Sequence, residues 1–506
     1  MSETTPELRQ RKTKTQIEKP KKKRPFINVA PLNTPLSHRL ETLGVIWHCI
    51  SIPFFICLFL FTISLGWLIW LIVILPYFIW WYGFDLHTPT NGKVSYRVRN
   101  SMKNLIIWKW FVNYFPIQVH KSCELDPTFT NVMVEETVDS SDEEDLVSEN
   151  SRTLIDSLFK KVGLKKRLND ADTSSVKSYK NVSVGPRYIF GYHPHGVISM
   201  GVVGLFGTNA LRNEPYEPPM KWLKPFFHDP SKGERLFPGL GKIFPLTLTT
   251  QFTVPFYRDY LMSLGITSAS AKNIKSLINN GDNSVCLVVG GAQESLLNDM
   301  IAKHARIGYG YKERQDIGSD SEDEDDGKKE VKLVLNKRKG FVKLAIELGN
   351  VSLVPTFAFG EADVYRLSRP KPGSLGYKFQ QWMKSTFQFT VPFFSARGVF
   401  IYDFGFLPFR NPINICVGNP IHVPAGALQE YKLNHPEEEP AEQPPKVKRT
   451  NSFTDLFKSK KTTTKTKIPP ELLDKYHKLY VDELKRVYEE NKHKFGYGDV
   501  ELNIIE

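Results

Sequence analysis

A long apolar run near the amino terminus constrains this chain more than any other feature. From Leu43 to Phe84 the sequence contains no Asp, Glu, Lys or Arg, and the run is about twice as long as the roughly 20 residues that one membrane-spanning helix needs. Ser64-Leu65-Gly66 lies near its middle, where a glycine favours a break. We therefore predict a transmembrane hairpin over residues 41–84 rather than a buried pair of core helices.

The basic balance of the chain bears on its partners and its orientation. The 506 residues carry a formal net charge of +13, so an anionic surface or ligand is expected; nucleic acid, phospholipid and a phosphorylated cofactor all qualify. The basic arm of residues 1–40 places that arm, and with a hairpin both termini, in the cytosol. The five cysteines show no paired spacing, which favours a reducing compartment over a disulfide framework or a zinc site.

Several segments contain too few apolar residues to fold. We predict disorder in the arm 1–40 and in three insertions near residues 135–179, 314–330 and 433–468. The remainder of residues 85–506 then forms one folded domain that these insertions interrupt.

Between the insertions, strand and helix patterns alternate. Apolar runs predict buried strands at Ser284–Val289 and Val351–Phe359, and apolar spacing predicts a helix over Gly340–Leu348 between them. Two more helices are expected at Ser268–Asn279 and Glu471–Tyr488, the second with Tyr480 among its inward residues. Continuously apolar strands belong to a parallel or mixed sheet covered on both faces, so the predicted class is α/β.

The chemistry is expected where another strand ends. Tyr188–Phe190 predicts a buried strand, and the turn formers Pro194 and Gly196 follow it. His193 and His195 would therefore lie on a tight turn at a strand end, where open α/β sheets place their sites. Histidine has the unperturbed pKa closest to neutrality, which suits a general base. On these residues alone, a structural pair that caps the turn is an equally good interpretation.

Polar groups after other strands could serve the same site. Gly290 and Gly291 would leave backbone amides open to an anion, and either Glu294 or Glu361 could orient an imidazole. Four cations could hold a phosphate. Arg258 is one, and the other three, Lys337, Arg338 and Lys339, lead into the N-terminus of a predicted helix.

The chain resembles the type-2 diacylglycerol acyltransferases. The matching blocks occur in order and together are highly specific: Tyr114-Phe115-Pro116, His193-Pro194-His195-Gly196, Arg258-Asp259, Gly290-Gly291-Ala292-Gln293-Glu294, and Arg338-Lys339-Gly340-Phe341 through to Phe359-Gly360-Glu361. The likeness covers about residues 40–130, 183–315, 330–430 and 470–506.

The resemblance implies a fold and an activity. The fold would be a glycerolipid-acyltransferase-like mixed sheet covered by helices. The enzyme would transfer the acyl group of acyl-CoA to 1,2-diacylglycerol, the last step of triacylglycerol synthesis, in the endoplasmic reticulum membrane and also at lipid droplets. Acyl-CoA is a substrate, and no further cofactor, no metal and no nucleic acid is expected; a homo-oligomer stays open.

The residues themselves suggest roles in this reaction. His195 would be the general base of a direct transfer, His193 would support it, and Glu294 or Glu361 would orient it. Related glycerolipid acyltransferases carry a His-x4-Asp motif, and here Ile198 or Met200 occupies the position of the aspartate. Substrate contacts are implied for Tyr114, Phe115, Pro116, Pro194, Gly196, Arg258, Gly290, Gly291, Lys337, Arg338 and Lys339.

Alternatives remain within and outside the family. The acceptor could be a monoacylglycerol or a fatty alcohol, as in a wax synthase. Outside the family, His193 and His195 could chelate a metal with Glu294 or Glu361 in a membrane metallohydrolase. A membrane-anchored lipid-binding protein without catalysis is the third interpretation.

Overall fold

The structure is a computed structural model of the whole chain. It describes residues 29–31, 33–128, 130–134, 178–182, 185–229, 233–298, 301, 329–368, 373–387, 393–402, 405–435 and 468–505. The arm 1–28 and most of the three predicted insertions lie outside the described residues, so their predicted disorder stays a prediction.

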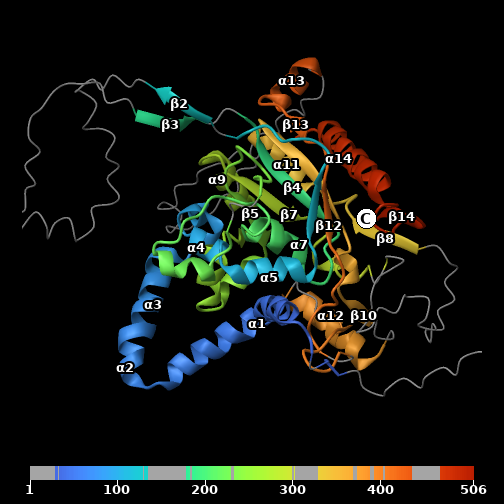
Figure 1. Ribbon diagram of the computed structural model, residues 1–506. Helices are drawn as coiled ribbons and strands as arrows, with labels where there is room; N and C mark the ends of the chain where they lie inside the picture. Colours follow the sequence, from blue (N-terminus) through green and yellow to red (C-terminus); the bar gives the residue numbers. More distant parts are fainter. Residues whose placement is uncertain are drawn as a thin grey trace, which may run out of the picture.

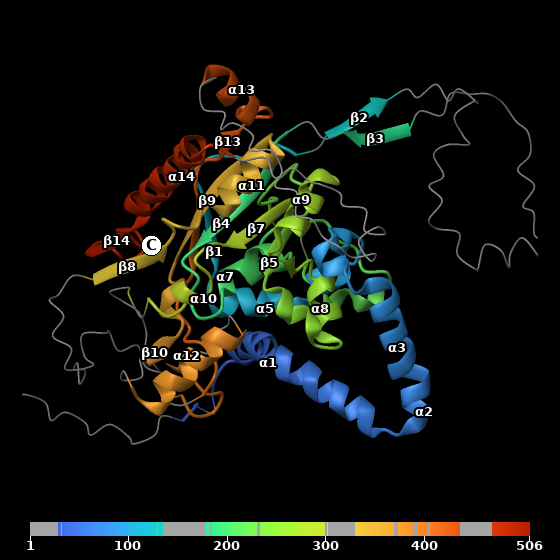
Figure 2. The ribbon, with the colours of Figure 1, turned by 180° about the vertical axis from the view of Figure 1, so that it is seen from behind.

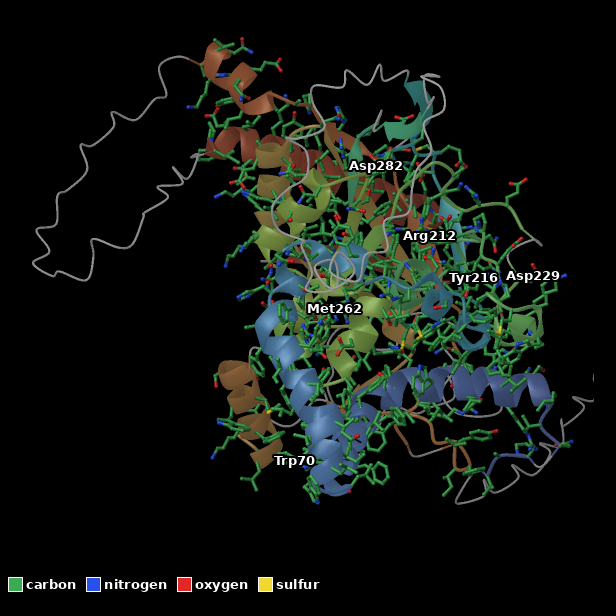
Figure 3. All side chains as sticks on the ribbon, turned by 90° about the vertical axis from the view of Figure 1, so that its left-hand side faces the viewer. Trp70, Arg212, Tyr216, Asp229, Met262 and Asp282 are labelled. Carbon is green, nitrogen blue, oxygen red and sulfur yellow. The ribbon has the colours of Figure 1, made fainter. Side chains whose placement is uncertain are left out.

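Two apolar helices project from the body of the molecule and meet at their far ends (Figures 1 and 2). The segments Leu36–Ser64 and Trp67–Thr90 are each long and apolar enough to cross a membrane. They meet at Gly66, whose φ of +97° breaks the helix as the sequence predicts. Figure 3 shows Trp70 near this break, far from Met262 in the folded domain. The described elements of this part are α1 (Leu36–Ser64), α2 (Trp67–Ile69), a π-helical turn (Trp70–Ile74), α3 (Leu75–Trp80) and a second π-helical turn (Trp81–Asp85).

The amino-terminal part of α1 belongs to the core as well as to the apolar helices. It packs along α5 (Ile106–Tyr114). At Gly44 the two backbones come so close that an added Cβ would lie 2.6 Å from the Phe111 nitrogen and 2.9 Å from the Ile107 oxygen. Val45 next to it is fully buried. The packing therefore joins the apolar helices to the domain.

The domain is built on one eight-stranded sheet. Its path runs β1–β12–β9–β4–β7–β5–β6, with β13 paired to β9. All pairs along the path are parallel except β12 with β9, and β13 also lies antiparallel to β9. The strands are β1 (Gln118–Lys121), β4 (Arg187–His193), β5 (Ile243–Thr247), β6 (Thr267–Ser268), β7 (Ser284–Val288), β9 (Val351–Phe359), β12 (Asn414–Val417) and β13 (Ile421–Val423). This confirms the predicted mixed sheet.

Smaller pairs and the helices complete the domain. The short sheets pair β2 (Thr130–Val134) with β3 (Ser178–Val182), β10 (Arg366–Ser368) with β11 (Phe393–Ser395), and β8 (Lys329–Val334) with β14 (Val500–Ile505). The remaining described α-helices are α4 (Asn100–Lys103), α7 (Met200–Val202), α8 (Tyr257–Ser263), α9 (Ala271–Asn279), α10 (Gly291–Glu294), α11 (Gly340–Leu348), α12 (Leu375–Phe387), α13 (Ala427–Asn434) and α14 (Pro470–Asn491).

The elements predicted from sequence are present with small shifts. Helices α9, α11 and α14 and strands β7 and β9 lie where the apolar patterns placed them. The edges of the insertions need correction, because β3 begins at Ser178, β8 begins at Lys329 and α13 extends to Asn434. Each of these three elements overlaps a range that composition alone assigned to disorder.

The central strand β4 is buried on both faces, and this fixes what each side chain meets. A Cβ on Gly191 would lie 1.9 Å from the Tyr480 hydroxyl of α14, so only glycine fits there. His193, two residues later, faces the same hydroxyl. Phe190 points to the opposite face, where its ring packs 5.1 Å from that of Phe206. The period of two along the strand thus directs His193 toward α14.

Candidate active site

Both histidines lie where the sequence predicts, at the carboxyl end of the central strand. His193 is the last residue of β4, and His195 begins the turn that leads to α7. Pro194 lies between them, and Gly196 follows with a φ of +60° that suits glycine. Since β4 lies between β9 and β7, groups from the ends of those strands converge on the same turn.

His193 is held inside the core. Its Nε2 lies 3.0 Å from the Tyr480 hydroxyl, and that hydroxyl donates to the Gly191 carbonyl at 3.1 Å. Because the hydroxyl has one proton, Nε2 must carry the hydrogen of their shared bond, and Nδ1 is an acceptor without a partner in the described structure. Burial lowers the pKa of His193 to about 3, so the ring is neutral near pH 7.

His195 has the features of a base. It is half-buried, and its Nδ1 lies 2.9 Å from the Gly196 carbonyl oxygen. A carbonyl only accepts, so Nδ1 carries the hydrogen and Nε2 keeps its lone pair. Burial lowers the pKa of His195 below its usual 6.5, which keeps the ring neutral near pH 7. The sequence motif therefore gives one imidazole with a fixed tautomer and an available nitrogen.

Glu294 holds the turn from the side of β7. The residue is fully buried in α10. One carboxylate oxygen accepts from the His195 backbone N–H at 2.7 Å, and the other accepts from the Val334 N–H at 2.9 Å. A Cβ on Gly290 would lie 2.1 Å from this carboxylate, which explains the glycine there. Burial raises the pKa of Glu294 to about 7.

Glu361 holds the turn from the side of β9. It is fully buried and accepts from the backbone N–H groups of Met200 at 2.7 Å and Gly201 at 3.0 Å. The Tyr192 hydroxyl donates to the same carboxylate at 2.6 Å. Burial raises the pKa of Glu361 to about 7 against these three hydrogen bonds.

The expected contact between a carboxylate and an imidazole is absent from the described structure. Glu294 and Glu361 both bond backbone N–H groups around the turn, and neither reaches the ring of His193 or His195. The physical reason is that a buried turn carries N–H groups that need acceptors. The two acids fix the backbone on both sides of His195, and the Gly196 carbonyl orients its ring.

The expected phosphate-binding cations divide into two groups. Lys337 and Arg338 are exposed ahead of α11, and the charge of Arg338 acts to lower the pKa of Glu294. Arg338 comes four residues after Val334, whose N–H donates to Glu294 beside the histidine turn of residues 193–196. Lys339 forms an ion pair of 2.6 Å with Asp474 of α14. The cluster thus lies on the side of the turn that Glu294 supports.

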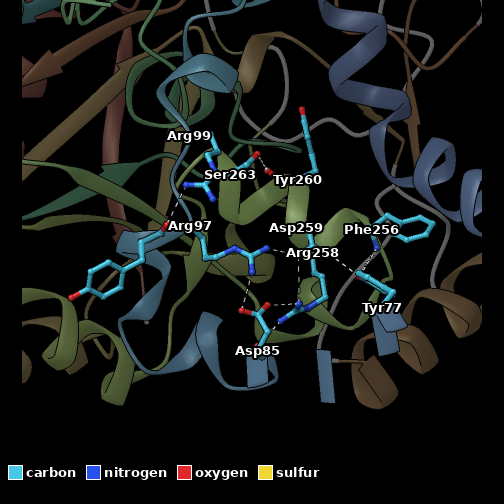
Figure 4. Close-up of polar contacts among 10 residues, drawn as sticks. Tyr77, Asp85, Arg97, Arg99, Phe256, Arg258, Asp259, Tyr260 and Ser263 are labelled. Atoms are coloured by element: carbon cyan, nitrogen blue, oxygen red, sulfur yellow. Dashed lines mark hydrogen bonds and ion pairs between the residues drawn. The ribbon is translucent and has the colours of Figure 1, made fainter. Parts of the chain in front are cut away.

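Arg258 has a structural position instead (Figure 4). It is fully buried, and its guanidinium donates to an Asp85 carboxylate oxygen at 2.6 Å and to the Asp85 carbonyl at 2.8 Å. It also lies over the ring of Trp81 at 4.8 Å. Arg97 bonds both Asp85 and Asp259, at 3.1 and 2.8 Å. The expectation that Arg258 binds substrate is corrected: with no exposed surface, it ties the second apolar helix to α8.

The Tyr114-Phe115-Pro116 block lies elsewhere. Tyr114 and Phe115 have no exposed surface, and the Tyr114 hydroxyl donates to the Pro408 carbonyl at 2.6 Å. Tyr114 and Pro116 line a cavity of about 710 Å³ beside the start of α1. The hydrogen bonds and ring contacts found for this block do not include either histidine. Tyr114 and Pro116 therefore line a cavity whose lining does not include His193 or His195.

Two tyrosines of the site did not emerge from the sequence as site residues. The sequence predicted Tyr480 only as an inward residue of the late helix, and Tyr192 lies between the predicted strand Tyr188–Phe190 and His193. The available signal was a hydroxyl at a core position, since a buried hydroxyl needs a partner.

Within the described ranges, no group of three or more His, Cys, Asp or Glu could hold a metal ion.

The fold and the site define a membrane-associated α/β protein with a histidine turn at the carboxyl edge of its sheet. Comparison with known proteins gives the family: the diacylglycerol acyltransferase model matches residues 61–136, 226–306 and 317–468, and the chain belongs to this family. The histidine turn lies between the matched segments. No solved structure matches the chain.

Relatives match over most of their length. Diacylglycerol O-acyltransferase 1 of Saccharomyces cerevisiae is 36% identical over 94% of this chain and 88% of its own. Diacylglycerol O-acyltransferase 2A of Umbelopsis ramanniana is 33% identical over 79% and 82%. A 2-acylglycerol O-acyltransferase 1 of Bos taurus is 28% identical over 95% and 99%.

Proposed function

We propose that the protein is an acyl-CoA:diacylglycerol O-acyltransferase that makes triacylglycerol, with His195 as its general base. The observation that carries the mechanism is the Nδ1 contact of His195 with the Gly196 carbonyl. It leaves Nε2 as a neutral acceptor at the carboxyl edge of the sheet. Relatives named diacylglycerol O-acyltransferase support the substrates. No cofactor other than the acyl-CoA substrate is needed.

The reaction is a direct transfer. His195 Nε2 takes the proton of the free hydroxyl of diacylglycerol while that oxygen attacks the thioester carbonyl. The tetrahedral intermediate then collapses, the C–S bond breaks, and the thiolate of coenzyme A receives the proton from the imidazolium. The Gly196 N–H makes none of the described hydrogen bonds that hold the turn, which supports it as a donor to the oxyanion. Lys337 and Arg338, which are exposed directly before α11, are the cations proposed for the phosphates.

The two apolar helices bear on where the protein lies in the cell. Two apolar helices give membrane association. We further propose the endoplasmic reticulum and lipid droplets as locations, with both termini in the cytosol, because the arm before α1 is basic. A homo-oligomer is compatible with this arrangement.

The deciding experiment is expression in a host that lacks its own neutral-lipid synthesis, followed by lipid analysis. We expect triacylglycerol from the parent chain and not from His195→Ala at equal abundance. A host that accumulates no triacylglycerol with a correctly inserted parent protein would contradict the proposal.

A second acceptor has support from a specific relative. The Bos taurus protein named 2-acylglycerol O-acyltransferase 1 covers nearly the whole chain. Purified protein with labelled acyl-CoA should therefore be given monoacylglycerol, diacylglycerol and fatty alcohol in competition. The acceptor with the highest kcat/KM is the preferred one.

A further inference from the structure

The cavity beside α1 contains a charge that the proposed reaction does not use. We propose that this cavity binds an anionic amphiphile: an acyl chain that carries a carboxylate or phosphate headgroup, with the headgroup on Arg397 and the chain along α1. The inference goes beyond the proposed function, because the acceptor diacylglycerol and the product triacylglycerol are uncharged, and the phosphates of the donor acyl-CoA are assigned to Lys337 and Arg338 outside this cavity. It also concerns residues whose described contacts do not include either histidine.

Arg397 is the observation that carries the inference. Its side chain lines the cavity and is only 8% exposed, and its Nε has no hydrogen-bond partner. In the described part of the chain no carboxylate forms an ion pair with it. Its guanidinium lies 4.4 Å from the Tyr402 ring and 3.5 Å from the Tyr114 hydroxyl. Ring contacts offset only part of the cost of burying a charge, so an anionic partner is expected.

A second arginine in the same cavity shows the contrast. Arg410 forms an ion pair with Glu41 of α1 and donates to the His38 carbonyl at 2.7 Å and the Thr42 hydroxyl at 3.2 Å. Its charge and its donors are therefore used to fix the start of α1. Among the described contacts Arg397 has no such role, which leaves its charge available to a ligand.

The walls of the cavity define the rest of the ligand. About 710 Å³ is within the range of sites for small molecules. Leu40, Leu43 and Ile46 of α1 form one wall, and Val399 and Phe400 form another. Phe400 is 76% exposed at the rim, beside a helix apolar enough for a membrane. A neutral lipid would leave Arg397 unpaired, and an inorganic anion would leave the apolar walls in contact with water. An amphiphile satisfies both.

Direct binding tests the proposal on the full chain. The protein is placed in phosphatidylcholine nanodiscs, and binding of labelled oleate, oleoyl-lysophosphatidate and oleyl alcohol is measured. We expect at least one anion to bind with at least tenfold higher affinity than the alcohol, which has the same chain and no charge. The better of the two anions identifies a carboxylate or a phosphate as the headgroup. Arg397→Gln should weaken anion binding about 10- to 100-fold, since it removes a charged hydrogen bond. Equal binding of the alcohol, or unchanged binding by Arg397→Gln, would overturn the proposal.

Control variants separate the cavity from general effects. Arg99→Gln removes an exposed arginine outside the cavity and should leave anion binding unchanged. Val399 is 38% exposed on the wall, so Val399→Trp can fill the cavity without entering the core. It should abolish binding of the anion, and Val399→Ala should not. If Arg397→Gln does not fold, this pair decides: retained binding in a folded Val399→Trp protein refutes the site.

Discussion

At the scale of single residues, one strand gives its two histidines different environments. His193 still follows the alternation of β4 and meets the hydroxyl of α14, whereas His195 lies beyond the strand. The backbone around His195 is held by Glu294 and Glu361. We therefore propose His195 as the base, because the sheet holds it in place without burying its ring completely.

This division predicts different losses for the two histidines. His195→Ala should reduce turnover about 10²- to 10⁴-fold, the usual cost of losing a general base, with the thermal unfolding temperature unchanged. His193→Ala should lose activity together with stability, because it leaves a void beside the Tyr480 hydroxyl. Coenzyme A release and thermal unfolding are measured on equal amounts of each protein. Near-parent turnover by His195→Ala would place the base elsewhere, and a stable, inactive His193→Ala would reverse the two roles.

The pH dependence of turnover should identify the titrating group. Only the neutral form of His195 accepts a proton, so activity should rise with pH through its pKa. Burial lowers that pKa below the usual 6.5, so the acid limb should lie below pH 6.5. The measurement is kcat/KM from pH 5 to 8, over which the protein must stay folded. A limb centred at about pH 7 would instead report Glu294 or Glu361, whose pKa values burial raises to about 7.

The sequence predicted that the histidine turn follows a buried strand, but not the hydrogen bonds around it. Pro194 and Gly196 mark the turn locally, and the positions of Glu294 and Glu361 after predicted strands indicated both acids. The partners themselves come from distant elements: Tyr480 is 287 residues from His193 and Glu361 is 169 residues from Tyr192. No local pattern encodes such a contact, and this is why the acids were expected on the imidazoles rather than on the backbone.

At the scale of elements, the apolar helices are anchored to the domain by buried contacts at both ends. The start of α1 packs on α5 through Gly44, and the end of the second apolar helix is bound to α8 through Asp85 and Arg258. Apolar patterning predicted the helices, and the Gly66 break, because it is a property of consecutive residues. It could not show that Arg258 pairs with Asp85, so the arginine was expected to bind phosphate.

Gly44 allows a direct test of the first anchor. Gly44→Ala should lower stability by about 1–3 kcal/mol, the usual cost of overpacking, because the added methyl group meets backbone atoms of α5 that cannot rotate away. Gly83→Ala is the matched control, since a Cβ there meets nothing within 4 Å. Thermal unfolding in one detergent compares the two variants with the parent. Equal stability of both variants would show that α1 and α5 separate freely.

At the scale of the whole molecule, the path of the apolar helices through the membrane decides on which side the histidine turn lies. The reaction uses acyl-CoA, and a helical pair that enters and leaves on one side keeps both termini with the domain. The domain carries two glycosylation sequons, Asn181-Val182-Ser183 and Asn350-Val351-Ser352. A glycan on either asparagine would show on which side of the membrane the domain lies, because glycans are added only to secreted or lumenal segments.

We expect neither sequon to carry a glycan. With the proposed cytosolic orientation, which rests on the basic arm before α1, Asn181 and Asn350 should stay unmodified. The measurement is gel mobility with and without an endoglycosidase, alongside a secreted glycoprotein as the positive control. Epitope tags at both ends give an independent readout, and both should be accessible when only the plasma membrane is permeabilised. A glycan on either asparagine would overturn the cytosolic orientation of the domain, and one protected tag beside one accessible tag would exclude the hairpin.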